Sequence, residues 1–174
     1  MTTVKKRGFG FWALQIPGWL LLTYLIYAQG ISAFSYNLGV AMGTQESAAV
    51  VTEVGTAFWY GFALGDILIY IPILIAGLIG HIRGTYWCRM ALAAAMGITV
   101  YWPVVSLAAL VDARNASGWN VPSETPYWVV CLMIAAWGVW GLWFIFRESQ
   151  QMHLEIVRWG CPKHIGNKSG KIDN

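Results

Sequence analysis

The chain has 174 residues, of which 57% are hydrophobic and only 11% are charged, and its formal net charge is +3. So few charged side chains cannot cover a water-facing surface, which excludes an ordinary soluble domain and indicates a membrane protein. The small positive charge does not indicate nucleic-acid binding, because no basic patch is interleaved with exposed aromatic side chains.

Four apolar runs have the length needed to cross a hydrocarbon core of about 30 Å as helices. They lie near residues 10–35, 56–80, 90–111 and 127–146. Because lipid offers the backbone no hydrogen-bond partners, each run is expected to be helical. The sequence therefore predicts an all-α fold, with an up-and-down four-helix bundle embedded in the lipid bilayer over residues 1–147 and a tail over 148–174.

The basic residues predict that both the N-terminus and the C-terminus are cytoplasmic. With the N-terminus inside, Arg114 is the one residue among the 11 Lys and Arg that lies outside, and such a bias in short loops sets the orientation. The first span also fits a cleavable signal peptide, but its length and the internal Pro17 and Gly18 favour a retained span. We expect a multi-pass protein of the plasma membrane, specifically a bacterial inner membrane, because the loops are short.

The second span contains the polar residue that is most costly to bury. Asp66 lies about 15 Å below the start of its apolar run, close to the bilayer midplane. An ionised carboxylate there costs at least about 3 kcal/mol, so Asp66 is expected to face the bundle interior or a wet cavity. Trp59, Phe62 and Tyr70 share its face on an ideal helix. Together with Tyr101 on the third span, these residues predict an intramembrane site centred on Asp66.

Two further features mark the second span. Gly61 and Gly65 form a GxxxG pair on a partly different face, which predicts close approach of another helix, from a second copy or a larger membrane complex. Pro72 removes the hydrogen bond to the carbonyl of Leu68 and predicts a kink one turn after Asp66.

The tail begins as a continuation of the fourth span. Met152, Ile156 and Trp159 recur at helical spacing opposite charged residues, which predicts a short amphipathic helix at the membrane interface. Gly160 and Pro162 are expected to end it, followed by disorder. The 11 Trp residues of the chain favour aromatic belts at both interfaces over a ligand-binding wall.

No cofactor and no metal are expected. The cysteines do not form the pairs that membrane disulfide oxidoreductases need on the oxidising side. His81, His153 and His164 lie at or beyond the predicted inner face, which excludes haem ligation across the bundle. Cys161 and His164 have a tolerable spacing for a metal but lack a second ligand pair. No nucleophile motif or phosphate-binding loop is present.

Three functions fit this pattern. The favoured one is a non-enzymatic protein that binds or transports a lipophilic or small polar ligand, with no catalytic residue. Its expected ligand-binding residues are Asp66, Trp59, Phe62, Tyr70, Tyr101 and Glu53.

The second function is an accessory subunit of a larger membrane complex, in which Asp66 only packs against the third span by bonding to Thr99, Tyr101 or Ser106. The third is a membrane enzyme in which Asp66, with Tyr101 or Glu53, performs acid–base chemistry on a lipid-like substrate.

Overall fold

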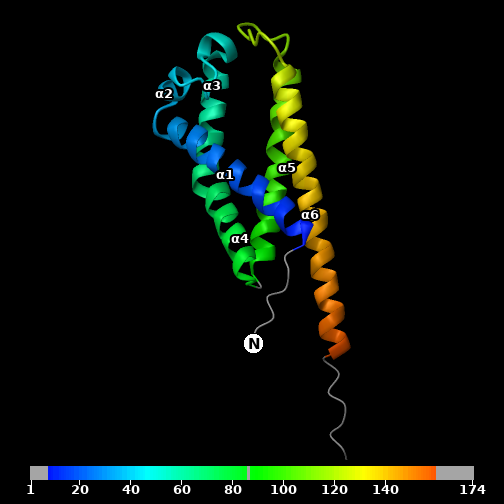
Figure 1. The fold of residues 1–174 in the computed structure, drawn as a ribbon. Helices are drawn as coiled ribbons and strands as arrows, with labels where there is room; N and C mark the ends of the chain where they lie inside the picture. The colour runs from blue at the N-terminus through cyan, green and yellow to red at the C-terminus, as the bar shows by residue number, and fades with distance from the viewer. Residues whose placement is uncertain (1–7, 86, 160–174) are drawn as a thin grey trace, which may run out of the picture.

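The protein is built around four helices of membrane-spanning length (Figure 1). The computed structural model describes residues 8–85 and 87–159, with side chains through residue 150. The helices long and apolar enough to cross a membrane are Phe9–Phe34, Ala48–Arg83, Cys88–Ala113 and Thr125–Gln150. This confirms the prediction of four helical spans, and the chain has the architecture of a multi-pass membrane protein.

Within the described residues every regular element is helical. In chain order the elements are α1 (Phe9–Phe34), α2 (Tyr36–Ala41), α3 (Ala48–Gly65), the π-helix η1 (Asp66–Tyr70), α4 (Ile71–Arg83), α5 (Cys88–Ala113) and α6 (Thr125–Trp159). The second span starts earlier than residue 56, where the apolar run was expected to begin, because α3 begins at Ala48. It is kinked at Thr52, whose φ of 68° and ψ of 166° lie in a region that favours glycine. The predicted tail helix continues α6 without a break, while Gly160 and Pro162 lie outside the described residues.

The helices form two arms that meet at one end and diverge toward the other (Figure 1). One arm is α5 packed along α6, and the other is α3, η1 and α4 in succession. The arms join where α4 packs on α5, whereas α3 stands apart from α5. α1 crosses obliquely and contacts α3, η1 and α4. The short turn between α4 and α5 makes these helices antiparallel neighbours.

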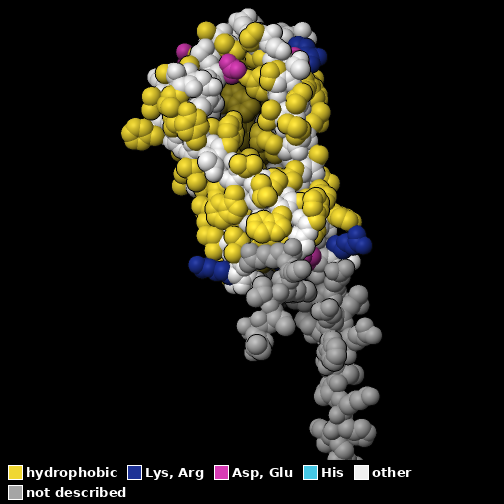
Figure 2. Space-filling model, in the orientation of Figure 1, with side chains coloured by type: hydrophobic (Ala, Val, Ile, Leu, Met, Phe, Trp, Pro, Cys, Tyr) yellow, Lys and Arg dark blue, Asp and Glu magenta, His cyan; other side chains and the backbone are white. Residues whose placement is uncertain are grey.

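The ends of the molecule differ in charge. Arg83, Arg89 and Arg147 lie at the end where α4 meets α5, which we call the basic end, and Arg114 lies at the opposite, loop end. Between them a broad band of hydrophobic side chains covers the surface shown in Figure 2. The predicted orientation, with the basic end in the cytoplasm, depends on this distribution.

The core lies in the half of the molecule near the basic end. Leu14 of α1, Leu74 and Leu78 of α4, and Leu92 of α5 are fully buried together. Helix association in lipid depends on close van der Waals packing rather than on removing apolar surface from water. Gly77 provides such packing, because a Cβ at this position would lie 3.0 Å from the backbone nitrogen of Leu92. The tight α4–α5 contact therefore fixes the point from which the two arms diverge.

The irregularity predicted at Pro72 takes the form of a π-turn. η1 begins at Asp66 itself, and the backbone N–H of Ile71 donates to the carbonyl of Asp66, five residues earlier. Proline has no N–H, and its ring would clash with the carbonyl four residues earlier in a regular α-helix, here Leu68. Wider turns of this kind interrupt α-helices at single positions. The distortion thus lies at the aspartate rather than one turn beyond it.

Hydrogen bonds tie the two arms together again at the loop end. The backbone N–H of Asn120 donates to the carbonyl of Val50 at 2.7 Å, and its side-chain Nδ2 donates to the carbonyl of Ala49 at 3.2 Å. The hydroxyl of Tyr127 on α6 donates to Oε1 of Glu46 at 2.5 Å. The space between α3 and α5 is consequently bounded by contacts at both ends.

Candidate ligand-binding site

A cavity of about 560 Å³ lies between the diverging parts of α3 and α5. This volume falls in the range of small-molecule sites, which are mostly apolar with a few polar groups. The wall consists of Ala57, Phe58, Gly61, Phe62, Gly65, Asp66, Ile69, Tyr70, Ile98, Tyr101 and Trp102. In Figure 2 the hydrophobic surface is also hollowed near the loop end, between the two arms.

The cavity opens sideways, toward the lipid. Phe58, Ile69 and Tyr101 in its wall are exposed, Tyr101 by 64%, although they lie within the spans. At the loop end the bonds of Asn120 and Tyr127 connect the arms, and at the basic end α4 packs on α5. The opening therefore lies between the two tied ends, on the apolar flank of the molecule.

Asp66 is the one acidic side chain in the wall, and no basic side chain accompanies it. It is only 8% exposed, and its carboxyl group makes no hydrogen bond or ion pair within the described part of the chain. A buried carboxylate without a partner is costly. The described protein therefore does not use the bonding capacity of this carboxyl group, and the buried indole N–H of Trp102, another wall residue, likewise has no hydrogen-bond partner among the described residues.

The neighbouring hydroxyl groups are already engaged with one another. The buried Tyr70 hydroxyl lies 2.5 Å from Oγ1 of Thr99, and the Thr99 hydroxyl donates to the carbonyl of Ala95 at 2.8 Å. Because Thr99 has a single hydroxyl proton, Tyr70 must be the donor to Thr99. Neither hydroxyl has a proton left for Asp66.

A purely packing role of Asp66 would require a hydrogen bond between its carboxyl group and Thr99, Tyr101 or Ser106. No such bond is present among the described residues. Thr99 bonds to Tyr70 and Ala95 instead, and the Tyr101 side chain is largely exposed. The buried Oγ of Ser106 has no hydrogen-bond partner there. In the described structure none of these three side chains makes the bond to Asp66 that the accessory-subunit alternative assumes.

Gly61 and Gly65 line the cavity, and none of the described helices covers them. A Cβ at either position would meet no atom within 4 Å. Packing of a helix from a second copy or a larger complex against this pair stays a prediction; in the described structure the pair leaves one side of the cavity flat and open.

The structure brings four of the six expected ligand-binding residues into one wall: Asp66, Phe62, Tyr70 and Tyr101. Trp59 lies beside this wall, with its ring centroid 5.8 Å from that of Phe62. Glu53 is exposed in the outer part of α3 and does not line the cavity.

Sequence reasoning missed Phe58, Ile69 and Trp102 as wall residues. Phe58, Phe62, Gly65 and Ile69 recur at spacings of four, three and four, so helical periodicity was the available signal.

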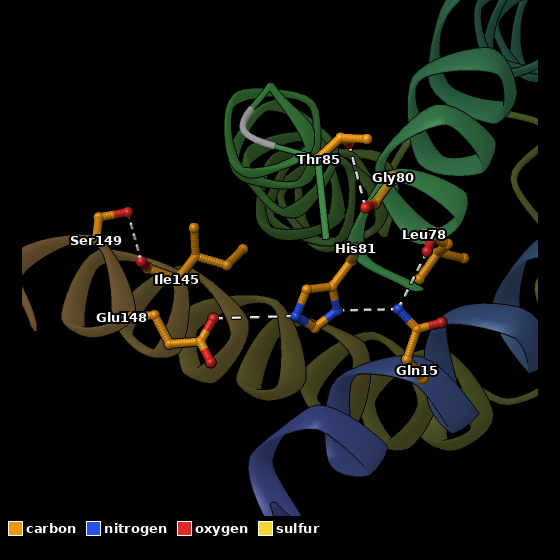
Figure 3. A network of polar contacts seen from close by, with 8 residues as sticks. All are labelled: Gln15, Leu78, Gly80, His81, Thr85, Ile145, Glu148 and Ser149. Carbon is orange, nitrogen blue, oxygen red and sulfur yellow. Dashed lines mark hydrogen bonds and ion pairs between the residues drawn. The ribbon is translucent and has the colours of Figure 1, made fainter. Parts of the chain in front are cut away.

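A second polar cluster lies at the basic end, among α1, α4 and α6 (Figure 3). Nε2 of the buried Gln15 donates to the carbonyl of Leu78 at 3.3 Å and lies 3.0 Å from Nδ1 of His81. Trp19 donates to Oε1 of Gln15 at 2.9 Å, and Nε2 of His81 lies 3.9 Å from a carboxylate oxygen of Glu148. These groups bond to one another, so the cluster joins three helices. No pattern in the sequence indicated the role of Gln15.

The cavity thus offers one carboxyl group, several aromatic rings and a lipid-facing opening. Among the described residues, no group of three or more His, Cys, Asp or Glu side chains is arranged to hold a metal ion. No protein-family model, no curated protein and no solved structure matches this chain.

Proposed function

We propose that this protein binds a lipophilic small molecule within the membrane, in the cavity between α3 and α5. The observation that carries the proposal is a space of about 560 Å³ whose wall combines aromatic rings with the buried, unpartnered Asp66. A void between helices loses van der Waals contacts on both sides. A ligand that fills it restores those contacts and supplies a partner for the carboxyl group.

Binding is better supported than transport. The loop end is tied by Asn120 and Tyr127, and the basic end is closed by the packing of Gly77 against Leu92. The cavity therefore communicates with lipid, whereas a transport route needs access to water on each side in turn.

An enzymatic role has less support. Acid–base catalysis commonly uses a second group within hydrogen-bond reach of the substrate. Glu53 lies outside the wall, and Tyr101, although in the wall, makes no hydrogen bond to Asp66 in the described structure. One specific observation supports the alternative function of an accessory subunit. The surface at Gly61 and Gly65 is uncovered, and a helix of a partner protein would fit against it.

The test compares two glycine-to-leucine variants. Gly65→Leu places a side chain in the cavity, and Gly97→Leu places one on α5 outside the wall. A Cβ added at either glycine would have no other atom within 4 Å, so neither substitution forces the neighbouring chain to move at that atom. Gly97→Leu is therefore the matched control.

Wild type and both variants are purified in lipid nanodiscs, and their bound small molecules and proteins are identified by mass spectrometry. We expect a lipophilic compound to be retained by wild type and Gly97→Leu and reduced at least tenfold, or about 1.4 kcal/mol, by Gly65→Leu. Equal retention in all three would overturn the proposal. A stoichiometric protein lost only from Gly65→Leu would instead establish the accessory-subunit function.

A further inference from the structure

We infer that the ligand is a lipophilic amine, whose ammonium group pairs with Asp66 while its apolar body lies in the rest of the cavity. This inference rests on the proposed function and specifies the chemistry of its ligand. Three features of the wall support it: its charge, its aromatic content and the position of Asp66 along it.

The wall offers no countercharge for Asp66 when its carboxyl group is ionised. Asp66 has no cationic neighbour in the wall, and the protons of Tyr70 and Thr99 are used elsewhere. An ammonium group supplies both the missing charge and the missing donor, and charge-assisted hydrogen bonds are roughly twice as strong as neutral ones. A neutral ligand would supply at most the donor.

The aromatic content also favours a cation. Five of the eleven wall residues carry aromatic rings: Phe58, Phe62, Tyr70, Tyr101 and Trp102. The face of each ring attracts a cation within about 6 Å, most strongly where water is excluded. Clusters of aromatic rings are a recurring means of binding quaternary ammonium ligands.

Asp66 lies toward one end of the wall. Wall residues on its arm extend from Ala57 to Tyr70, so Asp66 is about 13 Å from the loop-end limit at 1.5 Å per residue and about 6 Å from the other limit. Gly61 and Gly65 leave the longer part flat. The ligand is therefore an elongated apolar body with its amino group at the end nearer the basic end of the protein.

Entry from lipid does not require a charge to cross the bilayer. Without ligand, the carboxyl group is expected to hold its proton, because an unpaired charge in an apolar surrounding is costly. A neutral amine that enters takes this proton from the carboxyl oxygen onto its nitrogen. The product is an ammonium–carboxylate pair with no net charge.

The test uses two probes with the same hydrocarbon body, N,N-dimethyldecylamine and decan-1-ol. Their binding is measured to wild type, Asp66→Asn, Gly65→Leu and Gly97→Leu in nanodiscs of phosphatidylcholine, which has no net charge to attract the amine. Circular dichroism establishes that each variant is folded. Should Asp66→Asn not fold, the comparison of the two probes on wild type and Gly65→Leu decides the question.

We expect wild type and Gly97→Leu to bind the amine at least tenfold more tightly than the alcohol. Asp66→Asn should weaken the amine at least tenfold and leave the alcohol unchanged, while Gly65→Leu should weaken both. If both probes bind wild type equally and Gly65→Leu weakens both, the amine inference fails and the proposed cavity function stands. If Gly65→Leu weakens neither, both fail.

Discussion

Replacing Gly77 by alanine is expected to force α4 away from α5. The new Cβ would lie 3.0 Å from Cγ, Cδ2 and the backbone nitrogen of Leu92. The leucine side chain can rotate, but the nitrogen belongs to the backbone of α5 and moves only if the helix moves. The contact from which the two arms diverge is therefore disturbed.

The size of the effect follows from two opposing terms. Overpacking in a close-packed interior costs about 1–3 kcal/mol, while exchange of glycine for alanine inside a helix gains about 1 kcal/mol. Gly77→Ala should therefore destabilise the protein by about 0–2 kcal/mol. Gly97→Ala has no overpacking cost, because no atom lies within 4 Å of the new Cβ. Only the gain in helix propensity remains, so this variant should stabilise the protein. The difference between the variants is the overpacking cost, about 1–3 kcal/mol.

The assay is reversible unfolding in mixed micelles with increasing sodium dodecyl sulfate, followed by far-ultraviolet circular dichroism, for wild type and both variants. Gly77→Ala should unfold at less dodecyl sulfate than Gly97→Ala. If the two variants unfold together, or Gly77→Ala is the more stable, then α4 and α5 do not approach each other as closely as described.

Three other perturbations have defined outcomes. Tyr70→Phe removes the donor to Thr99 and should reduce the free energy of unfolding by about 0.5–1.5 kcal/mol, and its effect should not add to that of Thr99→Val in a double-mutant cycle. Gln15→Leu should cost about 1–3 kcal/mol in the same micelle assay, because it removes the polar group that bonds to the carbonyl of Leu78 and the partly buried Trp19 indole. An unchanged stability would show that the cluster at the basic end contributes nothing. The hydrogen bond from Arg114 lowers the pKa of Glu124. The stabilising contribution of this bond is therefore present at neutral pH and is lost as the pH falls through the lowered pKa. Melting curves over a pH series should show less acid sensitivity for Glu124→Gln than for wild type.

The spans could be predicted because the requirement for about 20 apolar residues is independent of the details of packing. The start of α3 could not, since Ala49 and Val50 receive hydrogen bonds from Asn120, some seventy residues further along the chain. Local composition alone suggested a loop there.

The candidate site was predictable only in part. An ideal helix places Trp59 and Phe62 with Asp66, yet the wall includes Phe62 and leaves Trp59 beside it. The surroundings of Gly61 and Gly65 depend on how far α3 diverges from α5, which contacts at the two ends of the arms determine. The sequence of a glycine pair does not determine whether a helix, a ligand or lipid packs against it.

The π-turn at Asp66 sets the rotational phase of the two halves of one span. Each residue of an α-helix turns the following side chains by about 100°, and a wider turn absorbs one residue without advancing the helix normally. Rewinding this turn as regular α-helix with all its residues kept would swing Leu74 and Leu78 about 100° away from the core, whereas deleting one residue between 66 and 70 would leave their directions nearly unchanged. The span therefore consists of two helical segments whose faces are oriented independently: α3 faces the cavity and α4 faces the core. Asp66 begins the π-turn that sets the rotation between them.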